Sequence, residues 1–108
     1  MNLKIIDCIK TCYWEKSGME KEDYINKSYT CGNEIILGIY DDLELKLISF
    51  FHEVGHIASI LFNEEIENKY QQEKLAWDTG LQIAASYGVY FSEKTENWAN
   101  QQLETYNT

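Results

Sequence analysis

The chain has 108 residues, which is enough for one small domain spanning 1–108 and not for two. Its net charge is −9 and its nine basic residues are scattered lysines, so we expect no nucleic-acid partner. No stretch approaches the roughly 20 apolar residues of a membrane span, so no membrane partner is expected. An odd number of cysteines and a charged start without a signal peptide favour a reduced, cytoplasmic protein. The sequence does not indicate the oligomeric state.

The first 23 residues predict a helix followed by a loop. Apolar side chains recur at three- and four-residue steps between Leu3 and Tyr13, as helical spacing requires. Residues 15–23 are polar and contain Gly18, so they are expected to form a loop.

A β-hairpin is expected next. Tyr29-Thr30-Cys31 is short and β-prone, and Gly32-Asn33 fits a two-residue hairpin turn. The run from Ile35 to Tyr40 is apolar and rich in branched residues, which is typical of a strand. Together these segments predict a small antiparallel hairpin.

A long helix is expected from about Leu43 to about Phe62. Asp41 and Asp42 precede it and can cap its N-terminus. Its apolar residues recur with helical spacing and predict a core stripe made of Leu47, Phe50, Phe51, Val54, Ile57, Ala58 and Leu61.

Two further helices follow a predicted loop at residues 63–68. The first spans about Tyr70 to Tyr87 and stops at Gly88, a residue type that commonly ends helices. Ser92 can cap the last helix. The predicted fold class is therefore α+β and mainly α, with a small antiparallel hairpin or sheet packed beside the helices.

The central feature of the sequence is the segment HEVGH, which contains both histidines of the chain. On a helix, residues four apart share a face, so His52 and His56 can direct two imidazole nitrogens at one metal ion. Glu53 lies about 100° round the helix from His52, where it can reach a metal-bound water and act as a general base. The alternative is a pair of surface histidines that bind no metal.

A catalytic zinc site usually has three protein ligands and one open position, so a third ligand is required. No histidine remains, which leaves a carboxylate or a thiolate. The HExxHxxGxxH class is excluded because Ser59 and Phe62 stand where it has its glycine and third histidine. Glu64, Glu65 and Glu67 follow the motif too closely and are expected to form a solvated acidic loop.

Glu73 is the favoured third ligand. Ala76, Gly80 and Ala84 share its helix face, so this helix can press closely against another one. A carboxylate at the end of such a face is costly to bury without a strong partner, and a zinc ion on the facing helix would be that partner. The alternative leaves Glu73 in water at the helix start, where acids favour the dipole. Asp78 lies about 140° away on the helical wheel and is expected to be a solvated acid or a group that orients a histidine.

The cysteines offer a rival metal site. Cys8 and Cys12 are also four residues apart, so they could complete a structural tetrahedron with His52 and His56. This hypothesis is less favoured because it leaves Glu53 without a role.

Residues 33–88 resemble the gluzincin zinc metallopeptidases. The resemblance rests on a strand, the helix with HEVGH, and a second helix with Glu73-Lys74-Leu75-Ala76. Within that class the segment is similar to the small ImmA/IrrE-like group of phages and mobile elements and to the minigluzincins. The minigluzincins are also of about this size.

The resemblance implies a zincin-like fold that binds Zn²⁺ as cofactor. It implies His52, His56 and Glu73 as the metal ligands and Glu53 as the base and proton shuttle. It also implies that the strand at Ile35 to Tyr40 is a sheet edge, along which an extended protein or peptide substrate is held by main-chain hydrogen bonds.

The leading hypothesis is therefore zinc-dependent hydrolysis of a peptide bond. Other members cleave repressors or are latent peptidases, so the resemblance implies a regulatory protein of a phage or mobile element as substrate, or a weak or latent activity. No donor for the developing oxyanion is evident, and Tyr87 and Tyr90 are the candidates. Gly55 is costly inside a helix, which indicates that the strand or a substrate passes close to it. The alternatives are a peptidase-like domain that binds a protein segment without cleaving it, and the structural Cys/His zinc site.

Overall fold

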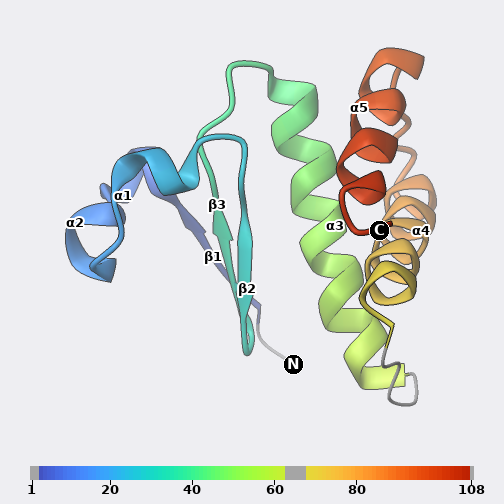
Figure 1. The fold of residues 1–108 in the computed structure, drawn as a ribbon, viewed down its shortest axis with the longest axis horizontal. Coiled ribbons are helices and arrows are strands. Elements are labelled where there is room, and N and C mark those ends of the chain that lie inside the picture. The colour runs from blue at the N-terminus through green and yellow to red at the C-terminus, as the bar shows by residue number, and fades with distance from the viewer. Residues whose placement is uncertain (1–2, 63–67, 108) are drawn as a thin grey trace.

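The computed structural model describes residues 3–62 and 68–107. Its helices and its small sheet confirm the α+β, mainly α, fold class. The long helix α3 lies between the sheet on one side and α4 and α5 on the other (Figure 1). The elements are β1 (Lys4–Asp7), α1 (Cys8–Thr11), α2 (Trp14–Ser17), the 3₁₀ helix η1 (Lys21–Tyr24), β2 (Tyr29–Cys31), β3 (Glu34–Leu37), α3 (Leu43–Phe62), α4 (Lys69–Ser86) and α5 (Glu93–Glu104).

The sheet has three strands in the order β1-β3-β2, so β3 is its central strand. The predicted hairpin is correct: β2 and β3 are antiparallel, and Gly32 in the turn has a φ of 59°. The prediction that the strand at Ile35 to Tyr40 forms a sheet edge is wrong, because β1 pairs with the other side of β3 in parallel register. The two edges of the sheet are β1 and β2.

The predicted helix from Leu3 to Tyr13 is also wrong over its first half. Lys4–Asp7 forms strand β1, whose residues pair one to one with Glu34–Leu37. The helix α1 that follows has a single turn, which Asp7 caps and which ends at Cys12 with a φ of 48°. Pairing with β3 therefore outweighs the local helical spacing. Two short helices, α2 and η1, occupy most of the segment expected to be a loop.

The three long helices match their predicted positions closely. Asp42 caps α3, since its Oδ1 accepts a hydrogen bond of 2.7 Å from the Glu44 amide. Asn68 caps α4 and Ser92 caps α5 through bonds to backbone amides. Gly88 follows α4 with a φ of 77°, as a helix-ending glycine should. The predicted acidic loop at Glu64, Glu65 and Glu67 falls outside the described residues.

Two hydrophobic clusters hold the fold together. The first contains Ile48, Trp77, Ala99 and Leu103 and joins the helices α3, α4 and α5. The second contains Cys8, Tyr24 and Ile36 and covers the sheet. Of the predicted core stripe of α3, Phe51 and Ile57 are buried and Phe50, Val54 and Ala58 are partly buried, while the side chain of Leu61 lies outside the described part. Leu47 is wrong as a core residue, because it is 38% exposed whereas its neighbour Ile48 is fully buried.

Helices α3 and α4 cross at very short range. A Cβ atom added at Gly55 would overlap the backbone carbonyl of Ala76, and one added at Gly80 would overlap the carbonyl of Phe51. The predicted small-residue face of α4 therefore does press against a second helix, with Ala76 and Gly80 at the contact. The neighbour that requires Gly55 is α4, not a strand or a substrate as the sequence suggested. This crossing brings the two helices close enough to share one site.

Candidate metal centre

Helix α3 carries the two histidines on one face, next to α4. Their ring centroids are 4.5 Å apart, as expected for residues separated by one helical turn. The His52 side chain is 13% exposed and the His56 side chain is 24% exposed, so both lie at the base of a cleft, partly shielded from water.

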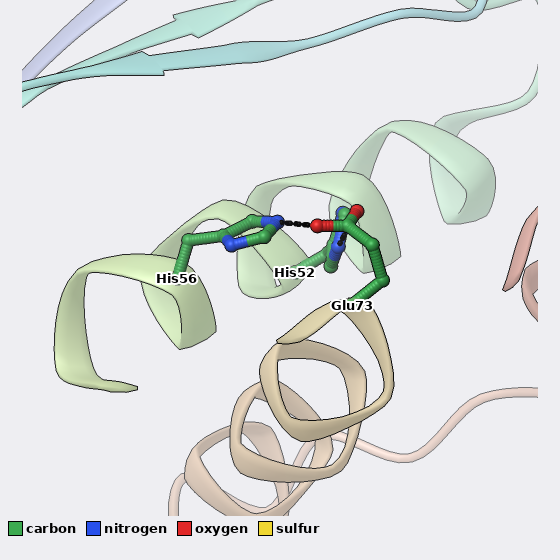
Figure 2. Close-up of side chains that lie close together, drawn as sticks. All are labelled: His52, His56 and Glu73. Carbon is green, nitrogen blue, oxygen red and sulfur yellow. Dashed lines mark ion pairs between the residues drawn. The ribbon is translucent and has the colours of Figure 1, made fainter. Parts of the chain in front are cut away.

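Glu73 reaches the two histidines from the first half of α4 (Figure 2). Its Oε1 lies 3.4 Å from Nε2 of His52, and its Oε2 lies 2.9 Å from Nε2 of His56. The residue is only 3% exposed, although carboxylates are rarely buried without a partner. The close crossing at Gly55 and Gly80 is what lets a side chain as short as glutamate bridge the two helices.

The three side chains fit a metal ion by their donor types and spacing. The two imidazole nitrogens and the carboxylate oxygen all lie within 4.8 Å of one another. Donor atoms on a tetrahedral zinc with bonds of roughly 2.0–2.1 Å would be about 3.3 Å apart, close to the observed spacings. Nε2 of His52 and Oε2 of Glu73 are buried, and among the described residues they make these ion-pair contacts but no hydrogen bond that meets the usual geometry. The three side chains are therefore a group that could hold a metal ion.

The electrostatics of Glu73 favour its charged form. Burial pushes the pKa of this carboxyl up, but the adjacent imidazoles of His52 and His56 outweigh burial and hold the pKa well below its usual range. Nζ of Lys69 lies 3.6 Å from Oε2, which adds a positive group at the edge of the site. A charged carboxylate is the form that a metal binds.

Glu53 sits beside the donor group but does not belong to it. It is 6% exposed, and Oγ1 of Thr30, on strand β2, donates a hydrogen bond to its Oε2. Its Oε1 lies 3.7 Å from Nδ1 of His52. Burial raises the pKa of Glu53, and the Thr30 bond and the His52 charge oppose that rise only in part. A carboxyl with a raised pKa exchanges a proton more readily near neutral pH.

These side chains form the base of an open cleft of about 760 Å³. Strand β2 and the loop before it border the cleft, as do the start of α4 and the end of α5. Its lining residues are Asn26, Lys27, Ser28, Tyr29, Thr30, Gly32, Tyr40, Ser49, His52, Glu53, His56, Lys69, Glu73, Trp77, Trp98, Gln102, Thr105 and Tyr106.

Several residues considered from the sequence lie elsewhere. Tyr87 and Tyr90 are 77% and 79% exposed and do not line the cleft, so they are poor oxyanion donors. Asp78 is solvated and pairs with Lys74 at 3.0 Å. Cys8 is fully buried in the cluster at the sheet, and no cysteine joins a metal-binding group within 3–62 and 68–107. The structural Cys/His hypothesis therefore receives no support from the structure.

Three cleft residues were missed by the sequence reasoning. Thr30 bonds Glu53, the Trp77 ring stacks on His52, and Tyr106 lies near Glu73, whose carboxylate helps burial to raise the pKa of the Tyr106 phenol. The sequence could have indicated Trp77 as a site residue, because it lies one helical turn after Glu73 and therefore shares its side of α4. No sequence pattern indicated Thr30 or Tyr106, because they reach the cleft from distant parts of the chain.

No protein-family model, curated protein or solved structure matches this chain. Of the helices in the described ranges, none is both long and apolar enough to span a membrane. Arguments about function therefore depend on the geometry of the cleft and on its residues.

Proposed function

We propose that this chain is a zinc-dependent peptidase of the gluzincin type, with His52, His56 and Glu73 as metal ligands and Glu53 as the general base. One observation carries the proposal. A buried carboxylate from α4 lies between two imidazoles from α3, and the donor atoms of the three side chains all lie within 4.8 Å of one another. Two histidines and a glutamate are a known catalytic zinc set that leaves one position open. Imidazole and carboxylate also suit other first-row metals, so the identity of the ion belongs to the proposal.

The residues around the metal would divide the work of hydrolysis. Zinc held by these three residues would polarise a substrate carbonyl and lower the pKa of a bound water. Glu53 takes the proton of the attacking water and returns it to the leaving amine, a role that its raised pKa suits. The Thr30 hydroxyl donates a hydrogen bond to Oε2 of Glu53, which leaves Oε1 to accept the proton of the attacking water. The burial of Glu53 keeps it in one place beside the donor atoms.

The substrate we propose is an extended peptide or protein segment held along the free edge of β2, in place of the β3 edge expected from the sequence. Cys31 and Glu34 flank the two-residue turn, so they form the hydrogen-bonded pair of the hairpin. The next pair, Thr30 and Ile35, is then a non-hydrogen-bonded pair, and the backbone groups of Thr30 point away from β3. They are available to a peptide on the cleft side. All three cysteines are free, which supports a cytoplasmic location.

Glu53→Gln tests the proposal directly. The variant should bind zinc as tightly as the wild type, by competition with a chromophoric chelator, and should lose cleavage of a fluorogenic peptide library. Asp78→Asn, which changes a solvated acid on α4, is the matched control and should keep both properties. Equal binding of a peptide by wild type and Glu53→Gln, with cleavage by neither, would replace the peptidase with a peptide-binding module. A wild-type protein that binds no divalent metal would refute the proposal altogether.

A further inference from the structure

The imidazole of His52 is stacked flat on the indole of Trp77. The ring centroids are 3.9 Å apart and the ring planes differ by 6°. Other contacts fix Trp77 in place. It is 6% exposed, it belongs to the hydrophobic cluster around Ile48, and its ring packs edge to face on Trp98 with centroids 6.4 Å apart. The orientation of the His52 ring is therefore tied to the packed core of the helices.

This contact takes the place of a hydrogen bond that would otherwise orient His52. A histidine that binds a metal through one nitrogen usually donates a hydrogen bond from the other, and that bond fixes the plane of the ring. Here the carboxylate oxygen next to Nδ1 of His52, Oε1 of Glu53, is 3.7 Å away, which is beyond hydrogen-bond reach. Nε2 has no hydrogen bond within the described part of the chain. The stack is the contact that sets the ring plane.

We infer that Trp77 is a positioning residue of the metal centre: its indole holds His52 in the orientation that directs Nε2 toward Glu73 and the metal. Trp77 follows Glu73 by one turn of α4, so the same helix supplies one ligand and the support for another. This inference rests on the metal site proposed above and does not depend on peptide hydrolysis.

Zinc affinity measured by chelator competition tests the inference without any activity assay. Trp77→Leu removes the flat ring and should weaken zinc binding by about 10–100-fold, the usual loss when a supporting partner of a ligand is removed. Trp77→Phe keeps a flat aromatic ring and should stay within about threefold of the wild type. Trp14→Leu is the matched control, because it removes an indole that packs on the cluster at the sheet and does not line the cleft, and it should leave zinc affinity unchanged.

A spectroscopic measurement separates positioning from general loss of packing. With Co²⁺ in place of zinc, the visible absorption of Trp77→Leu should be altered in shape, whereas that of Trp14→Leu should match the wild type. A merely structural role would lower the stability of both metal-free variants and leave both spectra alike. If Trp77→Leu does not fold, Trp77→Met replaces it as a side chain of closer volume without a flat ring.

The outcomes distinguish the two proposals. A wild-type protein that binds neither zinc nor Co²⁺ refutes the metal site. A wild type that binds zinc, together with a Trp77→Leu variant of equal affinity and identical Co²⁺ spectrum, refutes the role of Trp77 alone. In a Trp14→Phe, Trp98→Phe protein, Trp77 is the remaining tryptophan and its emission should be quenched by bound Co²⁺. Unchanged emission would also overturn the inference.

Discussion

The helix pair α3–α4 and the three-stranded sheet both border the cleft, but they supply different things to it. The helix pair supplies the three candidate metal ligands, and it is held together by backbone contacts at Gly55 and Gly80. The sheet supplies no member of that donor group and reaches the site through Thr30, which bonds the buried Glu53. The candidate metal ligands and the position of Glu53 therefore depend on different parts of the fold. Substitutions in the two regions should therefore have separable effects.

The largest effect should come from removing the ligand that joins the helices. Glu73→Gln keeps the size of the side chain but replaces the anionic donor, so zinc affinity should fall by more than about 100-fold, beyond the loss typical of supporting residues. Competition with a chromophoric chelator measures the affinity. Asp78→Asn on the same helix should bind zinc normally. Undiminished zinc binding by Glu73→Gln would exclude this residue as a ligand.

The helix crossing should be nearly as sensitive. In Gly55→Ala the new methyl group has no room, because the Ala76 carbonyl occupies its place, so the helices must separate. The free energy of unfolding in urea should fall by about 1–3 kcal/mol, the usual cost of overpacking. Zinc affinity should fall with it, since Glu73 moves away from the histidines. Gln82→Ala, on the exposed side of α4, is the control that should change neither quantity.

The helical region was also the part of the fold that the sequence predicted best. Helix signals are local: Asp42 and Ser92 cap the helices they precede, and the apolar spacing between them marks the buried faces. Strand β1 was missed because the partner that makes it a strand, Glu34–Leu37, lies far along the chain. Lys4–Asp7 is only four residues long, so the strand preference of its two isoleucines did not outweigh the helical spacing of the longer segment.

The contribution of the sheet can be tested with Thr30→Val, which is nearly isosteric but has no hydroxyl. Without the bond to Oε2, Glu53 loses its fixed position, and kcat for peptide cleavage should fall by about tenfold, the equivalent of roughly 1.4 kcal/mol. Zinc affinity should not change, because Thr30 is outside the donor group. Thr30→Ser restores the hydroxyl and should restore kcat. A Thr30→Val protein with wild-type kcat would show that the bond has no role in positioning the proposed base.

The candidate site was predictable to the extent that it is encoded on single helices. The spacing of His52 and His56 gave two donors, and the small-residue face behind Glu73 gave the third. The partners of these residues come from elsewhere in the fold, so neither the Thr30 bond nor the stack on Trp77 follows from spacing alone. The assignment of ligand and base roles stays a prediction until metal binding is measured.

A smaller effect should appear in the pH dependence of the metal-free protein. The pKa of Glu73 is lowered in the folded state, so its stabilising contribution is present above the unfolded value of about 4.3 and is lost as pH falls through the folded pKa. Glu73→Gln should therefore flatten the acid side of the stability curve. Urea unfolding between pH 3 and pH 8 in the presence of a chelator measures this change.

Glu53 should have the opposite effect on the pH dependence of stability. Burial raises the pKa of its carboxyl, so the protonated form favours folding below the unfolded value of about 4.3, and that contribution is lost as pH rises through the folded pKa. Glu53→Gln should raise the stability of the metal-free protein at neutral pH relative to the wild type. Stability curves of the two variants that shift in the same direction would contradict the opposite environments of the two carboxyls.

Replacing the cysteines of the sheet region should have no effect on zinc binding. Cys8 packs against Tyr24 and Ile36, and the donor group near His52 contains no thiol among the described residues. Burial also raises the pKa of the Cys8 thiol, which opposes the thiolate form that zinc requires. Zinc affinity and stoichiometry of Cys8→Ala, Cys12→Ala should therefore equal those of the wild type, although the lost packing of Cys8 lowers stability. Loss of zinc binding in this variant would show that the cysteines of the sheet region, and not the helix pair alone, supply metal ligands.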